Sequence, residues 1–545
     1  MEPTPTADKE GVIMARCRVL LVVAAVGLSV LLAACGSSAE SDSSTGPVST
    51  TFTYATFTQV MVGWDPSTSY SNEIIAMSNM YETLTRYDPA KEKAEPLLAT
   101  SWKASSDART WTFQLRPGVT FHSGRPMTAK AVKAAIERTI KLNQGASYIW
   151  AAVKSIDAPS PDTVVFNLKY AAPLDLSASA DYAAYIYDTK ASGSEPLEDW
   201  FAAAHDAGTG PYTVEAWNSG QETELSLKAF PKYWGGWDGT HYERVVYRVV
   251  PQDTTASQLL TAGEVSFVEQ MTPSLWATMK QNPDIQTVNE PSWQNLLGFM
   301  NTQTGPLADL KVRQGVSYAL DYAGIIAALK GATIPAIGVV PPGLWGHFDD
   351  LPVYTRDMAK ATELLNAAGY GPGKKPMNLT MTITQGNPLE QTTATIMKAN
   401  LAEANVTLRV KPLAWATQWA KARSANPSER QDILVMYWWP DYANPYSWFV
   451  NLFRTESKPY FNLSYYSNPK LDVTMDRAEK LAATDRAAST ELYRDMQVTL
   501  LQDAPALNLF VQNNQYAYLR SVGNLVVNPA YPNVIFVYNL KPLPS

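Results

Sequence analysis

Two short segments in the first half of the chain alternate apolar and polar residues, which is the pattern of half-buried strands. They cover residues 111–115 and 164–168. Between them, apolar residues recur at helical spacing over 129–141, directly after Thr128, a residue type that caps helices. We therefore predict that the region 80–205 is a strand-rich unit with one packed helix.

The second half of the chain has a different pattern of predicted elements. Asp357 can cap a helix that runs to Ala368, and Gly369 follows it where a left-handed residue is favoured. Strands and helices then alternate, with strands at 379–383, 406–410 and 432–437 and helices near 389–404 and 413–424. This βαβαβ order predicts a mostly parallel sheet, in which ligands bind at the carboxyl ends of the strands. The residues just after Tyr437 are thus the place to look for a site.

The N-terminal region reads as an export signal. Two arginines follow Met14, an apolar run covers 19–34, and Cys35 ends the run in a sequence, LAAC, that resembles the bacterial lipobox. We expect residues 1–35 to be a signal peptide with its true start at Met14, Cys35 to carry the lipid, and 36–50 to be a flexible tether. A plain transmembrane anchor is the alternative, although the run is short for a span.

Composition narrows the classes of function. With 545 residues, the chain has room for two or three domains. Its net charge is −7 and it has no long basic run, so a nucleic-acid partner is not expected. Its two cysteines both lie in the first 35 residues, and its four histidines are far apart, which argues against a zinc site. No catalytic or phosphate-binding motif is present, so we expect neither an enzyme nor a cofactor.

One segment does offer chemistry. Residues 437–449, YWWPDYANPYSWF, follow the last predicted strand and place Asp441 among large aromatic residues. A carboxylate in an aromatic cleft can hold an ammonium group by a charge-assisted hydrogen bond, while the rings add apolar area and cation–π attraction. The alternative is that the rings are ordinary core and that Asp441 caps a helix beginning near Tyr442.

Several segments, taken together and in order, resemble one known family. The strongest is WTFQLRPGVTFHSGRPMTA at 111–129; the others lie at 81–88, 96–102, 208–212, 233–236, 260–264, 311–321 and 361–369. The chain is similar over about residues 50–540 to the family 5 extracellular solute-binding proteins, the peptide and nickel class that serves ABC importers.

This resemblance implies an α/β, two-lobed periplasmic-binding-protein-like fold of type II, with an extra inserted subdomain and a hinge between the lobes. Lobe I would comprise 51–80, 206–302 and 509–545, with 81–205 as the inserted subdomain and 303–508 as lobe II. The hinge crossings would lie near Asn301 and near 508–511.

The resemblance also implies roles for particular residues. Asp441 matches the aspartate that binds the α-ammonium group in peptide-binding members, and Trp438 and Trp415 match residues that line side-chain pockets. Tyr148 matches an aromatic that the inserted subdomain sends toward the cleft; Trp439 and Tyr442 flank Asp441 and complete the expected set. Some members carry an arginine in the strand before the aspartate, whereas 433–436 is wholly apolar here; Arg423 or Lys421 could replace it.

The resemblance implies a monomeric, lipid-anchored extracytoplasmic receptor that captures an oligopeptide and delivers it to the permease and ATPase subunits of an ABC importer. A carbohydrate receptor of the same fold is the next alternative, since 16 tryptophans suit sugar stacking. A nickel-chelate receptor is third. An anchored hydrolase, or a peptide sensor that does not support import, would be a different kind of protein.

Overall fold

The computed structural model describes residues 49–544. The predicted signal peptide, Met14, Cys35 and nearly all of the predicted tether lie outside the described residues. Within 49–544, no helix combines the length and the apolar character needed to cross a membrane.

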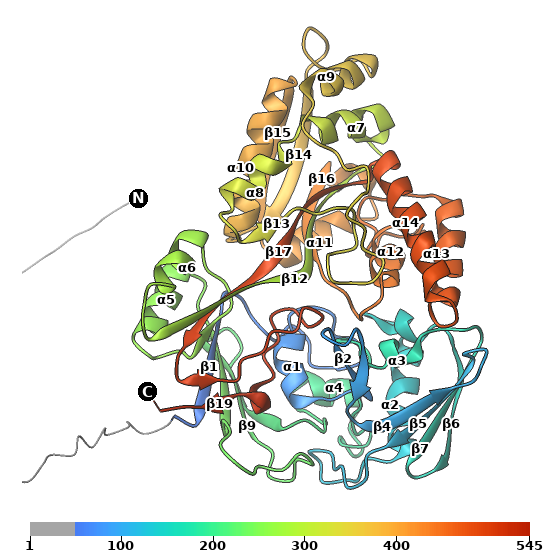
Figure 1. Ribbon diagram of the computed structural model, residues 1–545, viewed down its shortest axis with the longest axis vertical. Helices are drawn as coiled ribbons and strands as arrows, with labels where there is room; N and C mark the ends of the chain where they lie inside the picture. The colour runs from blue at the N-terminus through green and yellow to red at the C-terminus, as the bar shows by residue number, and fades with distance from the viewer. Residues whose placement is uncertain (1–48, 545) are drawn as a thin grey trace, which may run out of the picture. The chain divides into compact units, whose positions relative to one another are not determined.

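An 11-stranded mixed sheet organises the described chain (Figure 1). Its spatial order is β15 (Val406–Leu413), β14 (Met377–Thr384), β16 (Ile433–Trp438), β12 (Ile285–Met300), β17 (Ala506–Leu519), β11 (Phe267–Val268), β1 (Thr51–Thr56), β10 (Arg244–Val249), β9 (Thr223–Ala229) and β8 (Tyr212–Trp217), and β13 (Thr333–Ile334) pairs with β17. Strands close in sequence gather at the two ends of this order, while β12 and β17 lie between them.

The predicted βαβαβ unit is confirmed at one end of the sheet. Strand β14 pairs in parallel with both β15 and β16, and α10 (Pro388–Glu403) and α11 (Trp415–Ala422) make the two crossovers. The helix predicted near 413–424 is present as α11, but the strand predicted to end at Val410 continues to Leu413, which still pairs with Thr384 in the parallel ladder. The sheet pairing therefore extends β15 at the expense of the helix.

Strands β12 and β17 are the longest of the sheet and are antiparallel partners along most of their length. The first section of β12, Ile285–Pro291, pairs with the second half of β17, and its last section, 295–299, pairs with the first half. The register breaks between Pro291 and Asn295. Because β16 also pairs with β12 only from Asn295 onward, this break separates the two ends of the sheet.

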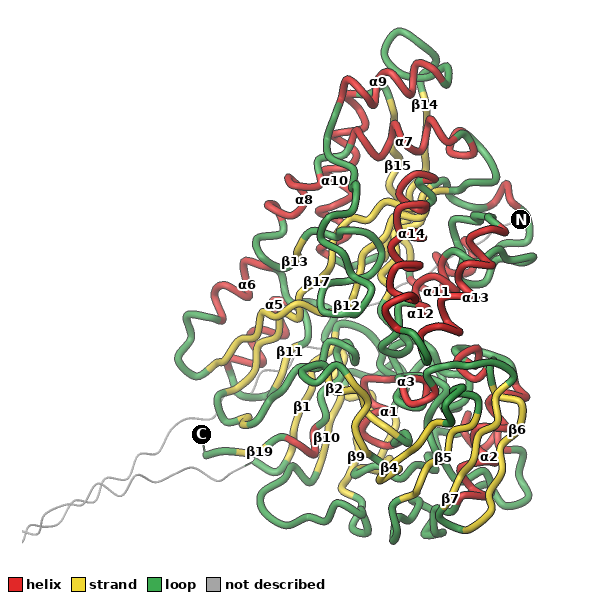
Figure 2. The backbone as a smooth tube through the Cα atoms, turned by 45° about the vertical axis from the view of Figure 1, so that its right-hand side comes forward, coloured by secondary structure: helices red, strands yellow, loops and turns green. Residues whose placement is uncertain are grey.

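The region 80–205 is a strand-rich unit, as predicted, but it contains two short helices, α3 (Leu174–Ser177) and α4 (Leu197–Ala202), besides the one expected. Its four-stranded antiparallel sheet has the order β4 (Ala99–Ala104), β5 (Thr110–Leu115), β7 (Thr163–Leu168) and β6 (Val153–Ser160), and α2 (Ala129–Leu142) contacts β6 and β7 (Figure 2). Thr128 caps α2 by accepting from the Ala131 amide. The buried residues of α2 include Val132, Ala135 and Ile136, so the apolar stripe does face the sheet.

Shorter elements connect these sheets. Two small ladders join β2 (Thr85–Asp88) to β3 (Lys93–Pro96) and β18 (Val522–Gly523) to β19 (Lys541–Pro542). The remaining helices are α1 (Ile74–Met80), α3 (Leu174–Ser177), α4 (Leu197–Ala202), α5 (Asp253–Thr261), α6 (Pro273–Met279), α7 (Leu310–Ala319), α8 (Tyr322–Ala328), α9 (Met358–Ala367), α12 (Tyr446–Leu452), α13 (Pro469–Ala482) and α14 (Arg486–Asp503), with 3₁₀ turns η1 (Ser147–Trp150), η2 (Pro306–Ala308), η3 (Pro427–Glu429) and η4 (Val537–Asn539).

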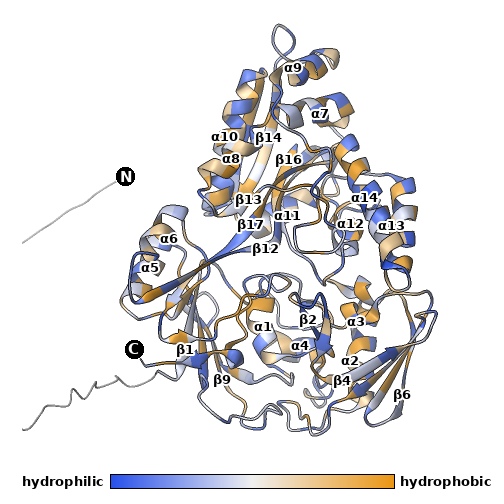
Figure 3. Cartoon of the chain, in the orientation of Figure 1, coloured by the Kyte–Doolittle hydropathy of each residue, from blue (hydrophilic) through white to orange (hydrophobic). Residues whose placement is uncertain are grey.

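Apolar side chains form a smaller and a larger core. The smaller one joins β14, β15 and β16 to α7, α8 and α10. The larger one joins the four-stranded sheet, α1 and the strands β1, β9 and β10, and it continues across the register break to the other face of β16 and to α12, α13 and α14. Figure 3 shows hydrophobic stretches along the strands and mixed hydrophilic and hydrophobic positions along the outer helices. Such amphipathic helices bury one face against a sheet.

Candidate functional site

Asp441 lies three residues beyond the end of β16, at the carboxyl end of the parallel strands. The segment after it does not begin a helix, because α12 starts at Tyr446 and is preceded by Pro445. The alternative that Asp441 caps a helix beginning near Tyr442 is therefore wrong. The Asp441 side chain does not cap a helix, and other side chains hold it in place.

Three side-chain donors converge on one oxygen of Asp441. Oδ2 accepts from the Tyr148 hydroxyl at 2.5 Å, from Asn451 Nδ2 at 2.9 Å and from Ser447 Oγ at 3.3 Å. Oδ1 receives no hydrogen bond from any described residue. Ser447 and Asn451 are four apart on α12, so they lie on the same face of that helix. The carboxylate is thus oriented through one oxygen, and the other remains available.

Burial sets the charge state of this carboxylate. Asp441 is only 7% exposed, and burial raises its pKa to about 6, although the donors from Tyr148, Asn451 and Ser447 favour the ionised form. No described lysine, arginine or histidine forms an ion pair with it. A buried carboxylate without a counter-ion is costly to keep charged, and a bound cation would remove that cost.

Tyr148, which contacts Asp441, comes from a distant part of the sequence, 293 residues away. It lies in η1, directly after α2, and Trp150 of the same turn donates from Nε1 to the Ala183 carbonyl at 2.8 Å. The Asn451 amide also donates to the Tyr148 hydroxyl, at 3.1 Å. The structure therefore brings together Tyr148 and Asp441, two residues that the sequence analysis placed in one site.

A second carboxylate, Asp181, lies beside Asp441. Its backbone amide donates to the Asp441 carbonyl at 2.9 Å, and the side chain is 3% exposed. The next residue, Tyr182, receives a hydrogen bond from Trp439 Nε1 at 3.0 Å. Trp439 thus contacts the 178–185 loop, whereas the sequence analysis had given it no particular partner.

An aromatic row extends away from Asp441. Trp438 contacts Phe461 with ring centroids 5.4 Å apart, Phe461 contacts Trp419 at 5.8 Å, and Trp419 contacts Trp415 at 5.4 Å. Tyr70 packs edge-on to Phe461 from the N-terminal part of the chain. Trp438 Nε1 is buried and has no acceptor among residues 49–544, so a ligand carbonyl could accept from it.

The remaining predicted residues take different positions. Trp415 lies at the outer end of the aromatic row and is 39% exposed. Tyr442 is buried and its hydroxyl is directed at Glu479, at 3.5 Å, within a polar cluster that includes Asn444. Tyr442 therefore helps to hold the segment that carries Asp441, and its hydroxyl points to Glu479 in the protein interior.

The two candidate cations on α11 are not equivalent. Lys421 Nζ is bound to the Glu429 carbonyl. Arg423 stacks on Tyr460, with its guanidinium carbon 4.3 Å from the ring centroid, and no described residue accepts a hydrogen bond from that guanidinium. Arg423 is the better placed of the two to meet an anionic group.

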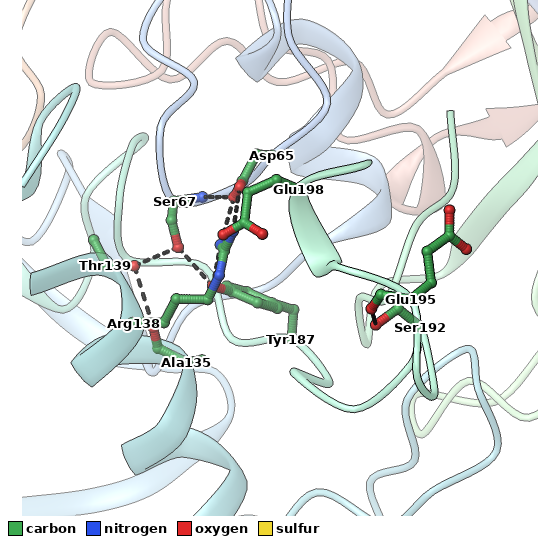
Figure 4. Close-up of polar contacts among 9 residues, drawn as sticks. All are labelled: Asp65, Ser67, Ala135, Arg138, Thr139, Tyr187, Ser192, Glu195 and Glu198. Carbon is green, nitrogen blue, oxygen red and sulfur yellow. Dashed lines mark hydrogen bonds and ion pairs between the residues drawn. The ribbon is translucent and has the colours of Figure 1, made fainter. Parts of the chain in front are cut away.

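A partly buried charge cluster, by contrast, forms a network whose charged groups are paired with each other (Figure 4). Arg138 on α2 donates to Asp65 at 2.8 and 2.5 Å and to the Tyr187 hydroxyl at 3.0 Å, and Tyr187 and Ser67 are hydrogen-bonded at 2.6 Å. Every charge there has an opposite partner. Such a network ties α2 to the 65–69 segment and leaves nothing for a ligand.

The described residues contain no group of three or more side chains of the kind that hold metal ions. The sequence analysis missed Asp181, Ser447, Asn451, Trp419 and Phe461. The spacing of Ser447 and Asn451 after Asp441 was the one signal available, because side chains four apart on a helix share a face.

Comparison with known proteins shows the family of the chain. The family model described as "Bacterial extracellular solute-binding proteins, family 5 Middle" matches residues 93–460. The chain belongs to this family. It is a solute-binding protein of the kind that works with ABC importers, and it is not an enzyme.

Curated relatives match most of the chain. It is 28% identical over 469 residues to the "Probable D,D-dipeptide-binding periplasmic protein DdpA" of Escherichia coli K12, which covers 85% of this chain and 88% of the relative. It is 26% identical over 443 residues to the "Glutathione-binding protein GsiB" of Escherichia coli O1:K1, covering 80% of this chain and 84% of that one.

Solved structures share the fold. The ABC transporter-associated periplasmic binding protein DppA of Helicobacter pylori, in complex with the peptide STSA, superposes with a TM-score of 0.78 at 22% identity and covers 91% of this chain and 98% of its own. NikZ of Campylobacter jejuni, in complex with Ni(L-His), gives 0.80 at 20% identity, covering 90% and 99%. The two-lobed type II binding-protein fold predicted from the sequence is confirmed.

Proposed function

We propose that this protein is a lipid-anchored receptor that captures an oligopeptide and delivers it to an ABC importer, with Asp441 binding the peptide's α-ammonium group. The observation that carries the proposal is the buried Asp441 carboxylate, which has an oxygen without a donor and no ion-pair partner among the described residues. The names of the dipeptide- and glutathione-binding relatives point to the same class of ligand.

An ammonium group suits this position better than a neutral one. Hydrogen bonds between charged partners are about twice as strong as neutral ones. Because Tyr148, Ser447 and Asn451 all bind Oδ2, a cation can approach Oδ1 without displacing them. The charge of the ligand would then replace the counter-ion that the described chain does not supply.

The aromatic row would take the side chains of the peptide. Trp438 and Phe461 are nearest to Asp441 along the chain of ring contacts, and Trp419 and Trp415 continue it outward. Arg423, stacked beside this row, would meet the peptide's carboxylate. Rings bind apolar side chains of many shapes, which is what a receptor for mixed peptides needs.

We also propose the domain organisation expected from the sequence. Lobe I would comprise 51–80, 206–302 and 509–545, with 81–205 inserted and 303–508 as lobe II. Contacts such as Tyr148 with Asp441 then join the inserted subdomain to lobe II. Cys35 would carry the lipid anchor, and Cys35→Ser should move the protein from the membrane fraction to the soluble fraction of cells; membrane retention of the variant would contradict the anchor.

Native mass spectrometry of the purified body, before and after gentle denaturation, tests the ligand class. We expect a heterogeneous set of adducts that sequence as short peptides. In calorimetry with one such peptide, Asp441→Asn should weaken binding at least tenfold. Asp188→Asn is a matched control, because Asp188 is also a buried carboxylate but binds Ser123 and Arg125. Adducts with hexose masses, or an affinity that is unchanged by Asp441→Asn, would overturn the proposal.

A further inference from the structure

Asp181 differs from every other buried carboxylate in the described chain. The side chains of the others each accept at least one hydrogen bond: Glu73, Glu82, Asp188, Glu224, Glu269, Glu390, Asp441 and Glu479. The Asp181 side chain accepts none from the described residues, and its Oδ2 is fully buried. Native proteins rarely leave a buried polar atom unsatisfied unless something outside the chain satisfies it.

The surrounding loop holds Asp181 next to the proposed ammonium site. Its amide binds the Asp441 carbonyl at 2.9 Å. Tyr182 is fixed by its hydroxyl, which donates to the Ser71 carbonyl at 2.7 Å, and Ala183 accepts from Trp150. Ala183 has a φ of 60°, a left-handed conformation that is rare for alanine and needs such support. The loop is therefore built to keep this carboxylate in place.

The two carboxylates repel each other and face no described cation. Burial, and then the charge of Asp441, raise the pKa of Asp181 well above its usual value. The other titratable groups that interact with the 181–182 segment are Glu73, Tyr185 and Tyr531, none of which is cationic. Without a ligand, no described cation neutralises the pair, so burial and mutual repulsion favour a proton on one of its members.

We propose that Asp181 is a second cation subsite, so that the site prefers ligands that carry two ammonium groups close together. The ligand class is a peptide whose N-terminal residue has a basic side chain, with its α-ammonium on Asp441 and its side-chain ammonium on Asp181. This inference rests on the proposed role of Asp441. A ligand of this class supplies one positive charge for each buried carboxylate, and the closed site then needs no proton.

Calorimetry with the tripeptides Lys-Ala-Ala, Orn-Ala-Ala and Nle-Ala-Ala tests the inference. Norleucine has the carbon chain of lysine without its amine, so the comparison isolates the second charge. We expect the better of the two basic peptides to bind at least tenfold more tightly than Nle-Ala-Ala. Equal affinity of all three peptides would overturn the inference while leaving the proposed function intact, since Nle-Ala-Ala still has an α-ammonium group.

Two variants separate the roles of the carboxylates. Asp181→Asn should remove the preference for basic peptides and leave the affinity for Nle-Ala-Ala within about threefold, whereas Asp441→Asn should weaken all three. Asp188→Asn, in the same segment, should keep the preference. A preference that survives in a folded Asp181→Asn protein would overturn the inference.

The number of protons exchanged gives a readout on the unmodified protein. Titrations at pH 6.5 in two buffers of different ionisation enthalpy measure it. Both titrations start from the same free protein, and the amino groups of both free peptides are almost fully protonated at this pH, so the difference in proton count reports the two complexes. The complex with the basic peptide should hold about one proton fewer than the complex with Nle-Ala-Ala. Equal counts would show that Asp181 stays protonated and would overturn the inference.

A comparison of two simple amines tests the Asp181 subsite without using a peptide. Cadaverine and n-pentylamine differ by one terminal amine, just as the lysine and norleucine peptides do. If no peptide binds, the proposed function fails, but tighter binding of cadaverine that is lost in Asp181→Asn would still support the second subsite. No difference between the two amines, together with no peptide preference, would overturn it.

Discussion

The Tyr148 hydroxyl donates to Oδ2 of Asp441 over 2.5 Å, although 293 residues separate the two in the sequence. Asn451 binds both partners, so the contact belongs to a small network and is not an isolated pair. If Asp441 binds the ligand as proposed, this contact couples the position of the turn that carries Tyr148 to the ligand.

Tyr148→Phe removes this hydroxyl and keeps the ring. We expect peptide affinity to fall about tenfold, because a hydrogen bond to a charged group contributes about 1.5 kcal/mol. Calorimetry measures the change. Tyr354→Phe is the control, since its hydroxyl binds the Leu501 carbonyl at 2.8 Å on α14 and has no contact with Asp441. Unchanged affinity in Tyr148→Phe would exclude a role for the network in binding.

The pH dependence of binding follows from the charge of Asp441. Burial raises its pKa to about 6, so the carboxylate is protonated below that pH and loses its attraction for an ammonium group. We expect affinity for Nle-Ala-Ala to fall as pH is lowered from 7 to 5 in the wild type. Residual binding by Asp441→Asn should be flat over the same range. A wild-type affinity that rises toward pH 5 would contradict the assignment.

The raised pKa of Asp441 also affects stability: the empty protein should become less stable as the pH rises, whereas peptide binding becomes stronger. Between about pH 4 and 6 the folded, ligand-free protein holds a proton on Asp441 that the unfolded chain has lost, so stability falls as pH rises through this window. A shift from 3.8 to about 6 corresponds to about 3 kcal/mol at pH 7. Asp441→Asn should therefore raise the free energy of unfolding of the empty protein at pH 7, measured with urea, and change it little at pH 4. A destabilised variant at pH 7 would contradict this account.

Much of the site's framework could be predicted from the sequence because it depends on local periodicity. The alternating apolar positions of β14 and β15 and the apolar run of β16 fix the parallel unit, and a ligand site at its carboxyl edge follows from the connections. Asp441 stands directly after that edge. The family resemblance added Tyr148, which no periodicity could have linked to Asp441.

The rest depends on contacts that no local pattern encodes. Asp181 lies in an irregular loop whose course is set by Ala183 in a left-handed conformation and by the distant partners Trp150 and Trp439. The end of β15 was misplaced for a similar reason, since Leu413 follows its pairing partner and not its helical neighbours. Tertiary pairing overrides local propensity at both places.

The aromatic row predicts a difference between two neighbouring tryptophans. Trp419 contacts Tyr70, Phe461 and Trp415, whereas Trp415 is 39% exposed at the end of the row. We expect Trp419→Ala to weaken binding of a peptide such as Ala-Phe-Ala at least tenfold and Trp415→Ala to weaken it less than threefold, because Trp419 is the less exposed ring and its loss costs more contact area. Calorimetry with Ala-Ala-Ala controls for general damage. Equal losses in both variants would contradict the graded role of the row.

The position of Arg423 leads to a prediction about recognition of the peptide's C-terminal carboxylate. Its guanidinium stacks on Tyr460 at 4.3 Å and has no acceptor among the described residues, while Lys421 on the same helix is bound to the Glu429 carbonyl. We expect the wild type to bind Ala-Ala-Ala about tenfold more tightly than its C-terminal amide, since a charge-assisted bond to the carboxylate would be lost in the amide. Arg423→Gln should bind the two equally, and Lys421→Gln should keep the difference. If the wild type does not distinguish acid from amide, then Arg423 serves only to stack on the rings, and the peptide's carboxylate stays in solvent.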